Sequence, residues 1–224
     1  MSQHDRARWF FAITSAVVSF GLVLQFILTV TTPSDEGLFE STPSRILVFF
    51  SFFTVLSNIL VATTTGLLAA DLDRRGTWFR VLRLDAVICI MVTGVVFHLA
   101  LADLQELTGW DKLADFLLHT LSPILAPLGW LMFGPRGHLD RRVVTLAAVP
   151  PVGWLGYALV LGASLEDRNG NDYYAYPFMN VEVHGYGVAL VRCALVAALF
   201  LAIAFGALAL DRRLPGVRGS AATD

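Results

Sequence analysis

Residues 46–70 read ILVFFSFFTVLSNILVATTTGLLAA, a run of 25 residues without a charged side chain. An α-helix rises about 1.5 Å per residue, so this run is long enough to cross the roughly 30 Å hydrocarbon core of a bilayer. The run nevertheless contains Thr54 and Asn58, whose polar groups hydrocarbon cannot solvate. It therefore predicts a transmembrane helix whose polar side chains face other parts of the protein.

Five further segments share this apolar character. Hydrophobic residues make up 56% of the 224-residue chain and charged residues only 15%, which is more apolar than soluble domains. Each run is continuous rather than alternating, and this favours helices over barrel strands. We predict an all-α polytopic membrane protein, a six-helix bundle forming a single integral membrane domain over residues 1–224. The predicted helices cover residues 9–31, 46–70, 81–102, 113–133, 143–163 and 186–210, followed by a polar tail at 211–224.

Basic residues are unevenly divided between the two ends of this bundle. Twelve arginines precede the first helix, lie in the second and fourth connections, or follow the last helix, whereas the other connections hold only Arg45, Lys112 and Arg168. The positive-inside rule then predicts that both termini are cytoplasmic. Arginine greatly outnumbers lysine, which indicates a GC-rich bacterial genome and hence a bacterial plasma membrane. No basic cluster suggests a nucleic-acid partner.

Polar side chains from several predicted helices fall at similar depths in the outer half of the membrane. Counted from the outer ends of their helices, Thr54 lies roughly 13 Å deep and His119 roughly 12 Å deep. Asp115, His119 and Ser122 are spaced by four and three residues, which places them on one helix face. An aspartate one turn from a histidine can orient the imidazole. Gln25, His98 and Arg192 also lie in this outer half, and Asn58 lies one turn below Thr54.

This set of residues suits acyl transfer. A threonine hydroxyl becomes a nucleophile when a neighbouring base takes its proton, and histidine is the usual base near neutral pH. We therefore expect Thr54 and His119 to be the catalytic pair. Asn58 is expected to donate to an oxyanion and Arg192 to hold an anionic head group. The predicted substrate-binding set also includes Gln25, His98, Asp115 and Ser122.

The predicted substrate is an amphiphile from the membrane, either a lipid or a lipid-like ester. No cofactor is expected, and no metal is expected because the histidines lack compact metal-ligand spacing.

The connection between the last two predicted helices carries an aromatic segment. Tyr173, Tyr174, Tyr176 and Phe178 follow a turn at residues 169–172. Tyrosine side chains favour the membrane interface, so one interpretation is a simple interfacial belt. The other is a cap over a site that faces outward.

Three stretches together resemble a known family. They are LLHTLSPILAPLGWLMFGPRG at residues 117–137, YAYPFMNV at 174–181, and Thr54 followed by Asn58. In helix number, topology and motif order, residues 8–210 resemble the androgen-induced-protein family of six-helix membrane proteins. Animal members of that family are threonine hydrolases of fatty acid esters of hydroxy fatty acids. The resemblance implies that Thr54 is the nucleophile and His119 the base of such a hydrolase.

Two other functions remain open. A protein that binds or transports a lipid or solute without chemistry would also need polar groups inside the bundle. A haem protein is conceivable as well, because His98 and His119 come from adjacent predicted helices and could provide bis-imidazole ligation. The sequence carries no pattern that fixes the oligomeric state.

Overall fold

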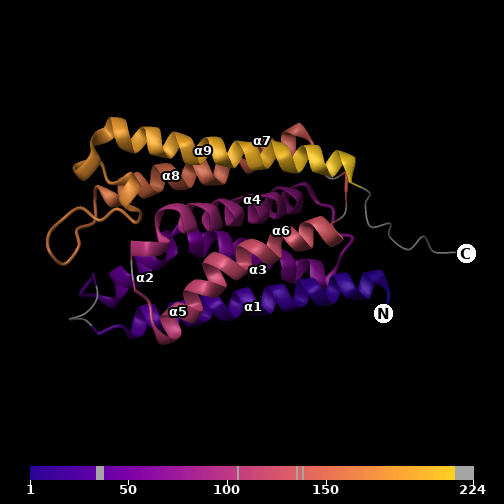
Figure 1. The fold of residues 1–224 in the computed structure, drawn as a ribbon, viewed down its shortest axis with the longest axis horizontal. Helices are drawn as coiled ribbons and strands as arrows, with labels where there is room; N and C mark the ends of the chain where they lie inside the picture. The colour runs from indigo at the N-terminus through magenta and orange to yellow at the C-terminus, as the bar shows by residue number, and fades with distance from the viewer. Residues whose placement is uncertain (34–37, 105, 135, 138, 215–224) are drawn as a thin grey trace, which may run out of the picture.

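The protein is an all-helical bundle in the computed structural model, which describes residues 1–33, 38–104, 106–134, 136–137 and 139–214 (Figure 1). No strand occurs among these residues, and six helical spans are long and apolar enough to cross a membrane. The helices are α1 (Gln3–Thr31), α2 (Thr42–Ser51), α3 (Phe53–Ala70), α4 (Thr77–Ala100), α5 (Gly109–Phe116), α6 (Ser122–Phe133), α7 (Arg141–Ala147), α8 (Val149–Gly162) and α9 (Val181–Arg213). A π-helical segment, η2 (Leu117–Leu121), joins α5 to α6, and short 3-10 helices cover Ala102–Leu104 and Pro177–Met179.

Side-chain caps fix where several helices begin. Ser2 accepts from the Asp5 N–H while the Asp5 carboxylate accepts from the Ser2 N–H, so α1 starts with a capping box. Asp140 accepts from the Val143 N–H at the start of α7, and Asn180 caps α9 in the same way. These caps satisfy N–H groups that have no partner inside their own helix.

Helix α4 is the central element of the bundle. It packs against α3, α6, α7 and α9, and it lies between a layer containing α1 and α3 and a layer containing α8 and α9 (Figure 1). Its apolar side chains Leu84, Ile88 and Val92 are buried among residues from α6, α7 and α9. By contrast, α1, α8 and α9 leave large apolar side chains exposed, as expected for surfaces in contact with lipid.

Three of the predicted helices are interrupted, so their predicted continuity is wrong, although the spans Gly109–Phe133 and Arg141–Gly162 lie close to the predicted bounds. Span 46–70 breaks at Phe52, whose ψ of 128° is extended. Span 113–133 contains the π-helical segment η2, and span 143–163 is divided at Ala148. The last interruption precedes Pro150, which has no N–H to continue the hydrogen-bond ladder of a helix. Six apolar spans nevertheless remain, as predicted.

The predicted polar face of span 46–70 points into the protein. Ser51, Thr54, Asn58 and Thr65 are all buried, although the break at Phe52 places Ser51 on a different helix from the others. Helix α1 begins and α9 ends at the same end of the bundle (Figure 1). Which side of a membrane that end faces stays a prediction, and residues 215–224 of the predicted tail lie outside the described residues.

The segment between α8 and α9 is fastened to α8 by a close contact at a glycine. A Cβ added to Gly162 would lie 2.4 Å from the Tyr174 ring, whereas one added to Gly156 on the same helix would meet nothing within 4 Å. We expect Gly162→Ala to lower the free energy of unfolding by about 1–3 kcal/mol, because the ring must move. Thermal unfolding in detergent micelles measures this effect. Gly156→Ala is the matched control, and equal stability of the two variants would contradict the prediction.

Candidate functional site

The site begins at the break between α2 and α3. The first helical hydrogen bond of α3 runs from Leu56 N to Phe52 O, so the three preceding N–H groups have no partner within the helix. Backbone groups freed in an apolar interior need partners, and here two aromatic residues from beyond α7 provide them. Trp154 Nε1 donates to Ser51 O at 2.8 Å, and Thr54 N donates to the Tyr176 phenol at 3.4 Å.

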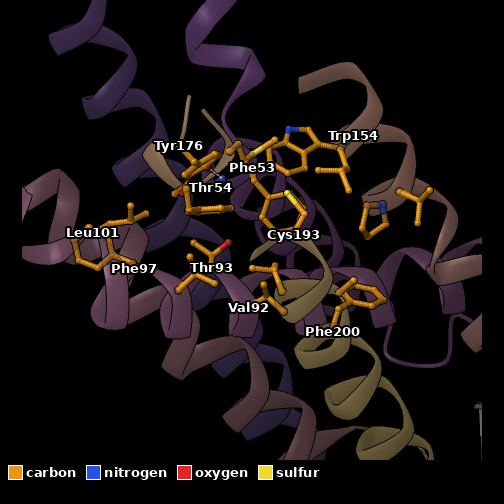
Figure 2. Close-up of a pocket in the computed structure, with 18 of the residues that line it drawn as sticks. Phe53, Thr54, Val92, Thr93, Phe97, Leu101, Trp154, Tyr176, Cys193 and Phe200 are labelled. Atoms are coloured by element: carbon orange, nitrogen blue, oxygen red, sulfur yellow. Dashed lines mark hydrogen bonds between the residues drawn. The ribbon is translucent and has the colours of Figure 1, made fainter. Parts of the chain in front are cut away.

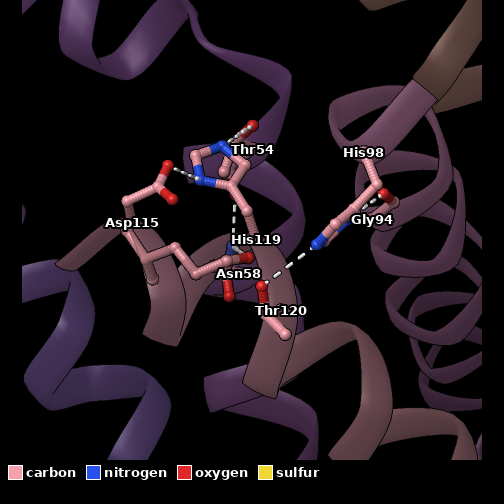
Figure 3. Close-up of polar contacts among 8 residues, drawn as sticks. Thr54, Asn58, Gly94, His98, Asp115, His119 and Thr120 are labelled. Atoms are coloured by element: carbon pink, nitrogen blue, oxygen red, sulfur yellow. Dashed lines mark hydrogen bonds and ion pairs between the residues drawn. The ribbon is translucent and has the colours of Figure 1, made fainter. Parts of the chain in front are cut away.

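Thr54 and His119 meet across two helices. Thr54 is the second residue of α3 and is 8% exposed, whereas His119 sits in the middle of η2. His119 Nε2 and Thr54 Oγ1 are 3.2 Å apart and hydrogen-bonded (Figure 3). The sequence predicted that these side chains converge, and they do so at the distance that proton transfer requires.

Asp115 completes a row of three side chains. Its carboxylate oxygen lies 2.9 Å from His119 Nδ1, off the direction of an ideal hydrogen bond (Figure 3). A carboxylate this close favours a proton on Nδ1 and leaves the Nε2 lone pair to accept from the Thr54 hydroxyl. The Asp115 and His119 side chains are 22% and 21% exposed, so this edge of the site is open to the outside.

The π-helical segment explains why Asn58 lies here. Ser122 N donates to Leu117 O, five residues back, and Pro123 has no N–H, so no backbone donor of its own helix remains for Leu118 O. Asn58 Nδ2 donates to that carbonyl at 3.1 Å and to Thr54 O at 2.8 Å. Both amide hydrogens are therefore used within the protein. Asn58 links the Thr54 helix to the His119 helix and has no hydrogen left for the oxyanion contact predicted from the sequence.

On its other side, Thr54 faces an apolar cleft between α3, α4, α8 and α9 (Figure 2). The cleft has a volume of about 180 Å³, and its polar side chains are few. Residues along its walls include Phe53, Thr54, Val92, Thr93, Phe97, Trp154, Tyr176, Cys193 and Phe200. The Phe97 ring stacks on the His119 imidazole with centroids 4.1 Å apart, so it screens the imidazole from the cleft.

Two other predicted residues form a second hydroxyl–imidazole pair. His98 Nδ1 lies 2.8 Å from Gly94 O, and because a carbonyl only accepts, Nδ1 carries the proton. His98 Nε2 then accepts from the Thr120 hydroxyl at 3.2 Å (Figure 3). His98 is exposed, and neither residue lines the apolar cleft.

The remaining predicted residues are less closely tied to the site. Ser122 is fully buried, and its hydroxyl has no hydrogen-bond partner in the described part of the chain. Gln25 lies one turn beyond Gly21, which packs against Leu118 of η2, but the Gln25 side chain makes no hydrogen bond among the described residues. Arg192 is half-buried on α9, does not line the apolar cleft, and forms no ion pair within the described ranges.

The haem alternative does not fit this geometry. Phe97 stacks on His119 and contacts His98 edge to face, with centroids 5.2 Å apart. Its ring occupies the space that a haem between the two imidazoles would need. Among the described residues, no three His, Cys, Asp or Glu side chains lie close enough together to hold a metal ion.

Sequence reasoning missed several features of the site. No glycine or proline adjoins Phe52, so the sequence does not indicate a break there. The π-helical geometry of η2 also has no simple sequence signal. The only sequence feature that indicated a contact of Tyr176 with Thr54 was the aromatic segment at residues 173–178. Because Tyr176 lines the apolar cleft and contacts Thr54, the structure favours the interpretation of that segment as a cap.

No family model, no curated protein and no solved structure matches this chain. The resemblance to the androgen-induced-protein family therefore remains a prediction.

The two hydrogen bonds of Asn58 predict a clear stability effect. Asn58→Ala leaves the buried Leu118 O without a donor, whereas Thr54 O keeps its bond from Ser57 Oγ, so we expect the free energy of unfolding to fall by about 1–3 kcal/mol. Thr63→Ala is the control, since Thr63 is exposed on the same helix. Thermal unfolding of both variants in detergent measures the difference, and equal midpoints would show that the Asn58 bridge contributes no stability.

Proposed function

We propose that this protein is a membrane hydrolase of lipid esters, with Thr54 as nucleophile and His119 as general base. The observation that supports it most strongly is the 3.2 Å hydrogen bond between Thr54 Oγ1 and His119 Nε2 beside an apolar cleft. A threonine in a membrane helix commonly bonds a carbonyl of its own helix. The hydroxyl of Thr54 is instead directed to an imidazole.

In the first half of the reaction the Thr54 hydroxyl attacks the ester carbonyl carbon. Its proton moves to His119 Nε2, a new C–O bond forms, and the carbonyl π electrons move onto the carbonyl oxygen. When this tetrahedral oxyanion collapses, the bond to the leaving alkoxide breaks and His119 returns the proton to it. The products of this half are the free alcohol and an acyl ester on Thr54.

In the second half, water attacks the acyl ester while His119 accepts a proton from the water. Collapse of the second tetrahedral intermediate breaks the bond between the carbonyl carbon and Thr54 Oγ1, and His119 returns the proton to that oxygen, which releases the carboxylic acid and restores the Thr54 hydroxyl. Asp115 holds the imidazole in the required tautomer and stabilises the imidazolium that forms in both halves. The partly exposed edge formed by Asp115 and His119 gives water a route to the acyl ester.

The apolar cleft supports a substrate with an acyl chain. It continues from Thr54 along α9 past Cys193 to Phe200, a rise of about 10 Å for seven helical residues. At its rim Val152 and Leu201 are 68% and 45% exposed, so the cleft opens toward the lipid-facing surface between α8 and α9. We propose a fatty acid ester of the hydroxy-fatty-acid type that reaches Thr54 from within the bilayer.

We further propose that the end of the bundle carrying both termini faces the cytoplasm of a bacterial plasma membrane. The arginine distribution supports this orientation. The site then lies in the outer half of the membrane, since α3 and η2 follow α2 and α5, which lie at the opposite end of the bundle from the beginning of α1 (Figure 1).

Lipid binding without chemistry is the second candidate function. The apolar lining of the cleft favours it, because an acyl chain can bind there whether or not Thr54 reacts. Hydrolysis distinguishes the two functions, since a binding protein would retain the intact ester.

The first test replaces the two proposed catalytic residues. With a fluorogenic medium-chain ester and purified protein, we expect Thr54→Ala to reduce turnover to background and His119→Ala to lower kcat by about 10²–10⁴-fold. Thr120→Ala is the matched control, because it disrupts the other hydroxyl–imidazole pair, and it should remain active. Full activity of both Thr54→Ala and His119→Ala would rule out the proposed function.

A second test concerns the acyl chain. Ala197 and the adjacent Ala198 are both exposed, but only Ala197 lines the apolar cleft. We expect Ala197→Trp to lower kcat/KM for long-chain esters about tenfold or more while sparing acetate esters, because the indole fills the cleft. Ala198→Trp is the control. An equal effect of Ala197→Trp on all chain lengths would contradict binding of the chain in this cleft.

A further inference from the structure

Tyr176 brings a hydroxyl from the segment between α8 and α9 to the start of α3. The side chain is 7% exposed and lines the apolar cleft, and the ring lies next to Thr54 (Figure 2). Its oxygen accepts from Thr54 N at 3.4 Å. The phenol also lies within hydrogen-bonding reach of the Thr54 hydroxyl, so its proton is held beside the proposed nucleophile.

We propose that the Tyr176 hydroxyl and the Thr54 N–H together form the oxyanion hole for a carbonyl attacked by Thr54. This inference rests on the proposed function. It assigns to Tyr176 the oxyanion contact that the sequence predicted for Asn58. Because both Asn58 hydrogens are bound to carbonyls, another donor is needed. Tyr176 is a buried polar side chain that contacts Thr54 directly.

The chemistry of the first reaction step requires such donors close to the nucleophile. Negative charge develops on the carbonyl oxygen as the Thr54 oxygen bonds to the carbonyl carbon, and effective donors lie about 2.7–3.1 Å from that oxygen. The Thr54 N–H is adjacent to the attacking oxygen, and during the attack it exchanges its bond to the Tyr176 oxygen for one to the carbonyl oxygen. Here it belongs to the first turn of α3, where the N–H groups lack helical partners and the helix dipole is positive.

The surroundings of Tyr176 suit a neutral hydrogen-bond donor. Its ring is held by aromatic neighbours, with centroids 6.1 Å from Phe52, 5.8 Å from Trp154 and 5.5 Å from Phe178. Burial raises the pKa of Tyr176 above its usual value, so the phenol keeps its proton near neutral pH. In these apolar surroundings a hydrogen bond to an oxyanion is stronger than in water.

A purely structural role makes a different prediction. If the Tyr176 oxygen only caps α3, its loss lowers stability and weakens ground-state and transition-state binding alike. If it binds the oxyanion, its loss acts on the transition state alone. The two roles are separated by kcat against KM and by an inhibitor that carries an oxyanion.

The experiment compares wild type with Tyr176→Phe, and with Tyr174→Phe as matched control. Tyr174 is a buried tyrosine of the same segment that packs on Gly162 and does not line the apolar cleft. With a fluorogenic ester in detergent micelles, we expect Tyr176→Phe to lower kcat by about 10²–10³-fold with KM unchanged. Tyr174→Phe should match wild type in both constants.

An alkyl trifluoromethyl ketone provides the second readout. Its carbonyl adds the Thr54 hydroxyl to give a hemiketal oxyanion, with the proton on His119. We expect Tyr176→Phe to weaken inhibition by this ketone by about 10²-fold, in step with kcat, while the affinity for the fatty-acid product stays the same. This pattern cannot come from loss of a helix cap.

The outcomes separate the inference from the proposed function. Activity that depends on Thr54 but is unchanged in Tyr176→Phe overturns the oxyanion role alone. Equal losses of ketone and product affinity in Tyr176→Phe, with a lower unfolding temperature, assign Tyr176 to capping and also overturn it. Absence of turnover in wild type, together with failure of the ketone to bind, overturns the proposed function and the oxyanion role with it.

Discussion

The arrangement of the site depends on the two hydrogen bonds that the side-chain amide of Asn58 donates. In an apolar interior each freed backbone carbonyl or N–H needs a partner, and the site contains two interruptions that free such groups. One is the break at Phe52 and the other is the π-helical segment η2. Asn58 bonds Leu118 O, which the π-helical segment leaves without a helical donor, and Thr54 O in the first turn of α3. Its two hydrogen bonds thus hold the proposed nucleophile and base in register.

Residues from α8 and from the segment between α8 and α9 provide hydrogen-bond partners for other backbone groups freed at the break. Trp154 satisfies Ser51 O and Tyr176 satisfies Thr54 N, and both aromatic rings also line the apolar cleft. Thr54 therefore has a polar side toward His119 and Asp115 and an apolar side toward the cleft. A lipid ester needs both kinds of surface, one for its reacting carbonyl and the other for its hydrocarbon chain.

The parts of this arrangement that follow from periodicity could be predicted from the sequence. Apolar runs mark the six spans, and the spacing of Thr54, Asn58 and Thr65 marks a face that is indeed buried. Depth counting placed Thr54 and His119 at one level, where they are now seen in contact. Their catalytic roles stay predictions.

Features that depend on tertiary contacts could not be predicted in this way. Phe52 has no local reason to leave a helix, and the break is stabilised by Trp154 and Tyr176, more than 100 residues away in the chain. The bond from Ser122 N to Leu117 O leaves Leu118 O in need of a donor. This bond cannot be predicted from the sequence, so the sequence predicted an oxyanion contact for Asn58 and not a bond to Leu118 O. Arg192 was placed in the site from depth alone, and depth does not say which way a side chain faces.

The central claim is that the Thr54 hydroxyl is activated by His119. Labelling of the purified protein with an alkyl fluorophosphonate, followed by peptide mapping with mass spectrometry, tests it most directly, because such a probe phosphonylates an activated hydroxyl and releases fluoride. The account predicts one adduct on Thr54 that is lost in His119→Ala. No adduct on Thr54, or an adduct on Thr120 instead, would contradict it.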